Sequence, residues 1–201
     1  MIGGNCSCFR ANPAHFVGHL PIWSSAATPI QAAAVVAFTP NTSLQAYVRH
    51  SALVHGYIAG QLYNTLVQLG VPCPRPAGGF YLYPDFSPWR TQLLERGVRT
   101  SQELVHYLLE EWDIAALPGS VFNEEPLALR LRLSTSLLCE PEHGPSPEER
   151  EAALWNILDQ AESLQPTGEK SRVAPSLPAL ARAEERLSQV IHVLETQRTH
   201  Q

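Results

Sequence analysis

Two arginines on one face of an expected strand are the residues of this sequence best suited to binding chemistry. Residues 127–134 alternate strictly: leucine stands at 127, 129, 131 and 133, and Arg130 and Arg132 stand between leucines. Successive side chains of a strand point to opposite faces, so both guanidinium groups share the face opposite the leucines. A guanidinium group holds a carboxylate through two parallel hydrogen bonds. This face is therefore either a carboxylate site or a solvent-exposed edge.

Most sequence signatures of an enzyme are missing. Lys170 is the only lysine among 201 residues, and it lies in a stretch rich in proline and glycine that predicts a linker. The cysteines, at positions 6, 8, 73 and 139, are too scattered for a disulfide framework and lack the second ligand pair of a zinc site, so we predict no metal. Walker, G-x-G-x-x-G, H-E-x-x-H and G-x-S-x-G motifs are absent from the sequence.

Composition narrows the class of protein further. The chain is 44% hydrophobic and 16% charged, which is sufficient for a buried core, and its net charge is −5. We therefore expect no nucleic-acid partner. No stretch approaches 18 consecutive apolar residues, and residues 1–16 lack the apolar region of a signal peptide, so we expect no membrane association and a cytoplasmic protein.

The pattern of elements predicts an α/β fold, a small sheet covered by helices. Apolar residues recur at helical spacing from Val54 to Leu69, which predicts a long helix over 41–70. Capping boxes, at Thr100 with Glu103 and at Ser146 with Glu149, begin two further helices. We expect short strands at 80–83 and 114–117 and the alternating strand at 127–134. These strands belong to a compact unit over 71–165, which is followed by a linker over 166–178 and a last helix over 179–197.

Three segments together resemble the class I/II aminotransferases, the pyridoxal-phosphate enzymes of the aspartate aminotransferase fold type I. They are Pro-Ala-Gly-Gly-Phe-Tyr-Leu-Tyr from residue 76, Ile-Ala-Ala-Leu-Pro-Gly-Ser-Val-Phe from residue 114, and Leu-Arg-Leu-Ser from residue 131. Their order and spacing resemble the carboxy-terminal part of that family. The stretch from Ser24 to about residue 34 resembles the segment before the family's long inter-domain helix.

The resemblance implies a division of labour between two domains. Residues 1–40 would be a remnant of the large cofactor-binding domain, and 71–165 the small domain that closes over the substrate. Arg132, which precedes a Leu-Ser pair as in the family, would bind the α-carboxylate of the amino acid or 2-oxo acid. Phe122 would lie near the site, and Ser24 or Ser25 would lie near the cofactor phosphate in a homodimer.

Departures from the family pattern leave several functions open. The family's Schiff-base lysine stands upstream of the serine-alanine stretch, and Met1 stands where an arginine of the following turn would be, so we expect this chain to begin after the catalytic lysine. Lys170 is too far along the chain to replace it, and Asn123 replaces a glycine. We expect an aminotransferase segment that does not hold pyridoxal phosphate or catalyse alone. The alternatives are a non-catalytic carboxylate-binding or regulatory module and a truncated, non-functional product.

Overall fold

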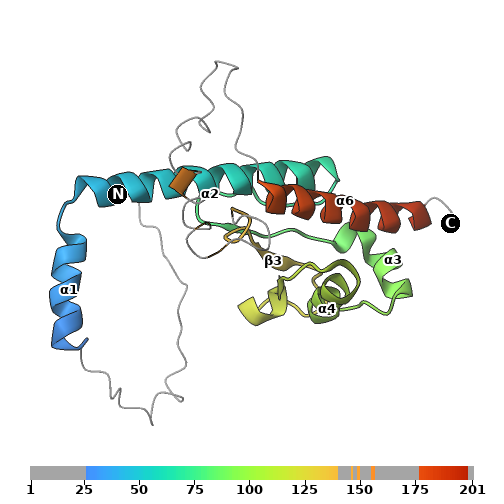
Figure 1. Ribbon diagram of the computed structural model, residues 1–201. Coiled ribbons are helices and arrows are strands. Elements are labelled where there is room, and N and C mark those ends of the chain that lie inside the picture. Colours follow the sequence, from blue (N-terminus) through green and yellow to red (C-terminus); the bar gives the residue numbers. More distant parts are fainter. Residues whose placement is uncertain (1–25, 140–145, 147–148, 150–154, 157–176, 199–201) are drawn as a thin grey trace, which may run out of the picture. The chain divides into compact units, whose positions relative to one another are not determined.

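The computed structural model describes residues 26–139, 146, 149, 155–156 and 177–198 (Figure 1). The chain divides into two compact units, residues 1–41 and 42–201. The first unit contributes one described helix, α1 (Thr28–Phe38), which has no buried residue. The second unit carries the sheet, its helices and the candidate site.

The second unit alternates helices with very short strands. Its described elements are α2 (Thr42–Gln68), β1 (Tyr81–Leu82), the 3₁₀ turn η2 (Ser87–Trp89), α3 (Arg90–Glu95), α4 (Ser101–Trp112), β2 (Leu117–Pro118), the 3₁₀ turn η3 (Gly119–Phe122), β3 (Leu131–Ser134) and α6 (Pro178–Arg198). A small sheet with helices around it is thus confirmed.

The sheet is antiparallel, and β3 is its central strand. The strand order is β1-β3-β2. Tyr81 of β1 pairs with Ser134 of β3, and Leu117 of β2 pairs with Arg132 of β3. An isolated bridge between Asp85 and Arg130 continues the β1–β3 register beyond the strands. Proline at 84 and 118 supplies no N–H to a ladder, which keeps β1 and β2 short.

The alternating segment is a strand over only half of its expected length. β3 begins at Leu131, and the exposed fraction of Leu127 is 58%. Before β3, the chain makes a turn in which the Ala128 N–H donates to the Glu125 carbonyl. Leu129, Leu131 and Leu133 are buried as the alternation predicts, so the two faces were assigned correctly and the starting residue was not.

Helices α2 and α6 lie side by side (Figure 1). The expected apolar stripe of α2 is buried at Val54, Ile58, Leu62 and Leu66. The helix ends at Gln68. Gly70, just beyond it, has a left-handed φ of +76°, and the Val71 N–H donates to the Leu66 carbonyl in the manner of a Schellman motif. The predicted apolar face of the last helix is also confirmed, since the following residues are buried: Leu180, Leu187, Val190, Ile191 and Leu194.

Both predicted capping boxes are present. The Glu103 N–H donates to the Thr100 hydroxyl, and the Glu103 carboxylate accepts from the Thr100 N–H, which begins α4. The backbone N–H groups of Arg99 and Thr100 both donate to the Glu103 carboxylate, which lowers the pKa of Glu103. Ser146 and Glu149 make the same reciprocal pair. Helix α4 contacts β2 and η3, so this cap fixes a helix beside the candidate site.

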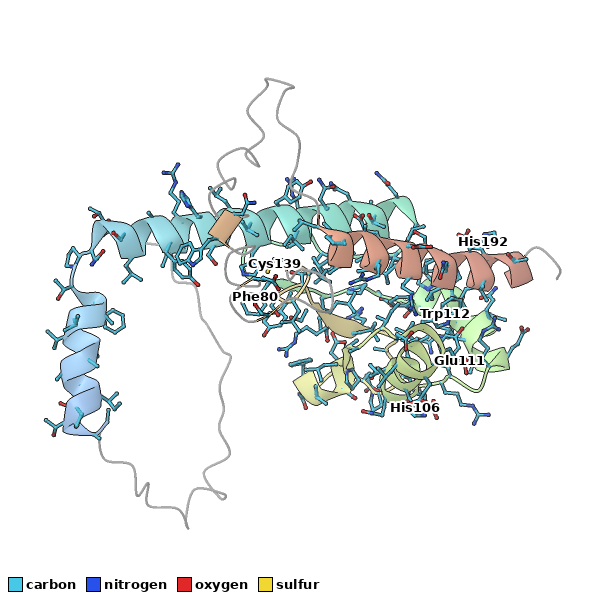
Figure 2. The ribbon with its side chains drawn as sticks, viewed as in Figure 1. Phe80, His106, Glu111, Trp112, Cys139 and His192 are labelled. Atoms are coloured by element: carbon cyan, nitrogen blue, oxygen red, sulfur yellow. The ribbon has the colours of Figure 1, made fainter. Side chains whose placement is uncertain are left out.

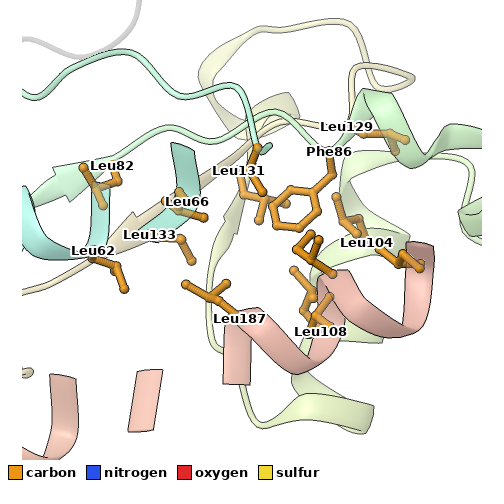
Figure 3. Close-up of a cluster of buried hydrophobic side chains, with 14 of the residues drawn as sticks. Leu62, Leu66, Leu82, Phe86, Leu104, Leu108, Leu129, Leu131, Leu133 and Leu187 are labelled. Atoms are coloured by element: carbon orange, nitrogen blue, oxygen red, sulfur yellow. The ribbon is translucent and has the colours of Figure 1, made fainter. Parts of the chain in front are cut away.

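One apolar core joins the helices to the sheet (Figure 3). Leucines of α2, α4, α6 and β3 meet around Phe86, which follows β1 and has no exposed surface. The core residues labelled in Figure 3 are Leu62, Leu66, Leu82, Phe86, Leu104, Leu108, Leu129, Leu131, Leu133 and Leu187. β3 places its leucines in this core, so its other face is available for polar chemistry.

Other expectations are not tested by the structure. The assignments of 1–40 as a remnant, of 71–165 as a small domain and of 166–178 as a linker stay predictions, and most of the linker lies outside the described residues. Among the described residues, no helix is long and apolar enough to span a bilayer.

Candidate functional site

The polar face of β3 and of the segment that follows β1 forms the candidate site. The register that pairs Tyr81 with Ser134 and Asp85 with Arg130 brings Tyr83 opposite Arg132. Alternate residues of the β1 segment, Leu82, Pro84 and Phe86, are buried. Tyr81, Tyr83 and Asp85 therefore share the face that carries both arginines.

Arg130 is held by two carboxylates. Its Nε donates to Asp85 Oδ2 at 3.1 Å, and its Nη1 donates to Glu124 Oε1 at 3.1 Å. Burial raises the pKa of Asp85, but hydrogen bonds from Ser87 and Arg130 outweigh that effect, and the net pKa is lowered. Arg130 is thus a neutralised cross-link rather than an open anion site.

Arg132 has a different environment. Its guanidinium carbon lies 4.2 Å from the centroid of the Tyr81 ring and 4.6 Å from that of Phe122. We call these two rings the aromatic pair. Among the described residues, Arg132 makes no ion pair. Stacking over a ring uses the π face of a guanidinium group and leaves its in-plane N–H donors for a carboxylate.

The 3₁₀ turn η3 places the Phe122 ring beside Arg132. The turn η3 ends at Asn123, which adopts a left-handed φ of +65° that asparagine tolerates better than most residues. The Gly119 N–H donates to the Arg130 carbonyl, which attaches η3 to the strand that bears Arg132. Asparagine therefore supports the turn at the position where the sequence departs from the family pattern.

The Tyr81 ring belongs to a series of ring contacts that reaches α2. The Tyr81 ring centroid lies 4.6 Å from that of Phe80, which in turn lies 5.7 Å from that of His55 on α2. Phe80 is labelled in Figure 2. Partial burial lowers the pKa of His55, which favours its neutral form. On the other side, the Phe122 ring meets the Tyr83 ring edge-on at 6.4 Å.

Gly119 leaves room for the polar groups beside Arg130. A Cβ at this position would lie 2.6 Å from Glu124 Oε2 and 2.9 Å from the Tyr83 hydroxyl. Burial, followed by the neighbouring Glu124 carboxylate, raises the pKa of Tyr83, so the phenol stays protonated at neutral pH. A side-chain hydrogen bond with Glu124 contributes to the same shift of the Tyr83 pKa, so the Glu124 carboxylate lies between Tyr83 and Arg130.

The structure brings together only part of the expected site. Phe122 contacts Arg132, whereas Ser24, Ser25 and Lys170 lie outside the described residues. Sequence reasoning missed Tyr81, Tyr83 and Glu124. The two tyrosines could have been found from the alternation Tyr-Leu-Tyr-Pro-Asp-Phe over 81–86, which resembles that of residues 127–134.

The donor set of the described residues does not fit pyridoxal phosphate by itself. The cofactor needs an amine for its Schiff base, an acid for its pyridine nitrogen and donors for its phosphate. No described residue is a lysine, and Asp85 and Glu124 are bound by Arg130. Within the same described part, no cluster of three or more metal-ligating side chains occurs.

A separate cavity of about 500 Å³ lies between α6 and the loop that follows α4, and Arg132 does not line it. One of its arginines, Arg186, donates to the Trp112 carbonyl and to Asp113 Oδ2. Its apolar lining comes from Leu62, Leu133 and Leu187. Arg186 therefore already has a carboxylate partner.

Comparisons with known proteins identify aminotransferases. The chain is 43% identical over 77 residues to an aspartate aminotransferase of Geobacillus stearothermophilus, with 38% of this chain and 19% of that protein covered. An aspartate aminotransferase of Pinus pinaster is 30% identical over 105 residues, with 43% and 21% covered. The chain thus spans about a fifth of the length of these relatives.

Solved structures and a family model were also compared. An aromatic aminotransferase from Pyrococcus horikoshii OT3 matches 61% of this chain and 26% of its own, with 22% identity and a TM-score of 0.31. The family model described as aminotransferase class I and II matches residues 16–139, which is more than half of the chain. The chain therefore belongs to the class I and II aminotransferase family.

Proposed function

We propose that this chain supplies the substrate-carboxylate site of a pyridoxal-phosphate-dependent aminotransferase. Arg132 binds the α-carboxylate of an amino acid or a 2-oxo acid, and Phe122 and Tyr81 hold its guanidinium group in place. The observation that carries this proposal is the difference between two neighbouring arginines. Arg130 is neutralised by two carboxylates, whereas Arg132, on the same face, lies against two rings and makes no ion pair among the described residues.

Physical chemistry supports this assignment of roles. An arginine that already has two carboxylate partners gains little from a third anion, because its charge and its best donors are used. An arginine that stacks on rings keeps its positive charge and has lost part of its side-chain freedom, which reduces the entropy lost on binding a ligand. The aminotransferase family implies amino acids and 2-oxo acids as substrates in general.

A titration of this chain tests the carboxylate site. We expect pyruvate to bind with a dissociation constant in about the millimolar range, since one bidentate contact in a partly exposed site is worth on the order of 4 kcal/mol at most. Pyruvamide has the same shape without the charge and is the matched control. Equal binding of the two compounds, or binding of neither, would contradict the proposal.

We further propose that the cofactor is held in a complete enzyme by residues outside the described part of this chain. Ser24 and Ser25 remain candidates for the phosphate, and Lys170, the only lysine, is not the Schiff-base residue. The missing cofactor-binding residues would come from a partner subunit, as in a homodimer, or from a longer aminotransferase chain.

This gives a testable expectation for the cofactor. The 201-residue chain mixed with pyridoxal phosphate should show an absorbance that rises linearly with added cofactor, without saturation at one equivalent. Borohydride treatment should leave a pyridoxyl label on no side chain other than Lys170. The Lys170→Arg variant is the control, because it should lose that label without any change in the titration. A saturable one-to-one band that survives in this variant would overturn the expectation.

A second candidate function, a regulatory module that pairs with another protein, is favoured by one observation. Helix α1 has no buried residue, and the exposed fractions of Val36 and Phe38 are 75% and 88%. A contiguous exposed apolar patch is typical of a surface that contacts another protein.

Light scattering during size-exclusion chromatography tests this candidate. We expect the chain to elute with a mass above 22.2 kDa at micromolar concentration. Replacing Val36 and Phe38 by serine should shift it towards that monomer mass, while serine at the buried Val54 should instead destabilise the fold. A monomer at every concentration tested would exclude self-association as the use of this face.

A further inference from the structure

We propose that Arg130 is a positioning residue that holds the aromatic pair, Tyr81 and Phe122, against Arg132. The inference rests on the proposed role of Arg132 for its functional meaning, but the geometry that carries it is independent of any ligand. Arg130 itself does not contact the substrate, because both of its engaged N–H groups face protein carboxylates.

The two carboxylates belong to the two segments that deliver the rings. Asp85 lies four residues after Tyr81, and Glu124 lies two residues after Phe122. These segments are far apart in sequence, and each is short: β1 has two residues and η3 has four. Arg130 lies between them on the strand that also carries Arg132, so one guanidinium group joins all three segments of the site.

Arginine is suited to this geometry and lysine is not. The planar guanidinium group donates from Nε to Asp85 and from Nη1 to Glu124 in directions fixed relative to each other. Each ion pair is partly exposed, with the Arg130 side chain 47% accessible, and such a pair by itself contributes little to global stability. Its consequence is local, because Phe122 is 42% exposed and its ring meets Tyr83 and Arg132, which both lie beside the bridge.

A second effect of the bridge is to keep Arg132 available. Coulombic effects of Glu124, Arg130 and Arg132 all reach Tyr83, which places these charges within one small region. Arg130 occupies one oxygen of Asp85 and one of Glu124 and compensates their charge, which weakens the attraction of both carboxylates for Arg132. Removing the Arg130 charge therefore both releases the rings and frees two competing anions.

The test compares Arg130→Met with Arg75→Met in the ligand-free chain by NMR. Arg75 is exposed, and its replacement removes the same charge outside the site. In the wild type, the Arg132 Nε–H and δ-methylene signals should show ring-current shifts from Tyr81 and Phe122. In Arg130→Met, we expect these shifts to move towards their unstructured values, while the methyl signals of the core residues Leu104 and Leu108 stay in place. Arg75→Met should leave both sets unchanged.

A milder variant keeps the proposal testable if Arg130→Met does not fold. Glu124→Gln preserves the side-chain size and weakens one of the two bridges, so it should move the Phe122 ring-current contribution more than that of Tyr81. Arg130→Lys should rescue the wild-type pattern only in part. A folded Arg130→Met or Glu124→Gln chain whose Arg132 signals match the wild type would overturn the inference.

Ligand binding separates this inference from the proposed function. Pyruvate should bind to Arg130→Met roughly three- to tenfold more weakly than to the wild type. If the wild type binds no carboxylate but its Arg132 signals still respond to Arg130→Met, the positioning role stands and the proposed function fails. If the wild type binds pyruvate but its Arg132 signals do not respond to Arg130→Met, the proposed function stands and the positioning role fails.

Discussion

We expect the Arg132→Gln chain to bind carboxylates about 30-fold or more weakly than the wild type, which would place a millimolar interaction beyond detection. Glutamine keeps part of the side-chain length and one donor group but removes the charge and the bidentate geometry. Charge-assisted hydrogen bonds are worth on the order of 2 kcal/mol, and each 1.4 kcal/mol corresponds to a factor of about ten in the dissociation constant. Calorimetry or NMR titration with pyruvate measures the change.

Arg130 provides the internal comparison for this result. Arg130→Gln removes the same group from the same strand face, two residues away, but from an arginine that is already neutralised. We expect its effect to be several times smaller and to act through the rings that contact Arg132. Equal losses in the two variants would show that the carboxylate is shared between the arginines or bound by Arg130.

Phe86→Ala should cause a large loss of stability. The Phe86 side chain has no exposed surface, its ring lies 6.3 Å from that of Trp89, and the core leucines surround it. Truncating a fully buried phenylalanine costs about 3–5 kcal/mol, a large fraction of the 5–15 kcal/mol that stabilises a typical domain. Thermal unfolding followed by circular dichroism should show a midpoint lower by roughly 10 °C.

Phe122→Ala is the matched control for the core variant. Both substitutions truncate a phenylalanine, but Phe122, the last residue of η3, is 42% exposed and packs on Arg132 and Tyr83 rather than in the core. Its unfolding midpoint should change by no more than a few degrees. A larger loss of stability in Phe122→Ala than in Phe86→Ala would contradict the division between core and site.

The spacing of apolar residues predicted most of the helices and strands, because the buried face of each element directly determines that spacing. Leu129, Leu131 and Leu133 are buried and Arg132 is on the opposite face, as alternation requires. Thr100 begins α4 through a capping box, which depends on residues only three apart. Such local signals can be read from a single sequence because their partners are near in the chain.

Features that depend on distant partners could not be predicted in the same way. The alternation gave Arg130 and Arg132 the same surroundings, and only the fold brings Asp85, which is 45 residues away, to Arg130. The strand length at Leu127 was overestimated because a strand also needs a partner, and the β1 segment offers one only as far as the bridge at Arg130. Ser24 and Ser25 remain predictions from family resemblance.

Site-resolved NMR of the arginine Nε–H groups, during a pyruvate titration of the wild-type chain, tests the central claim most directly. A carboxylate bound in the plane of the guanidinium group should shift the Arg132 Nε–H signal downfield in a saturable way. The Arg130 signal should move little, because its Nε already donates to Asp85. A saturable shift at Arg130 or at another arginine, with Arg132 unchanged, would contradict the assignment of Arg132 as the carboxylate-binding residue.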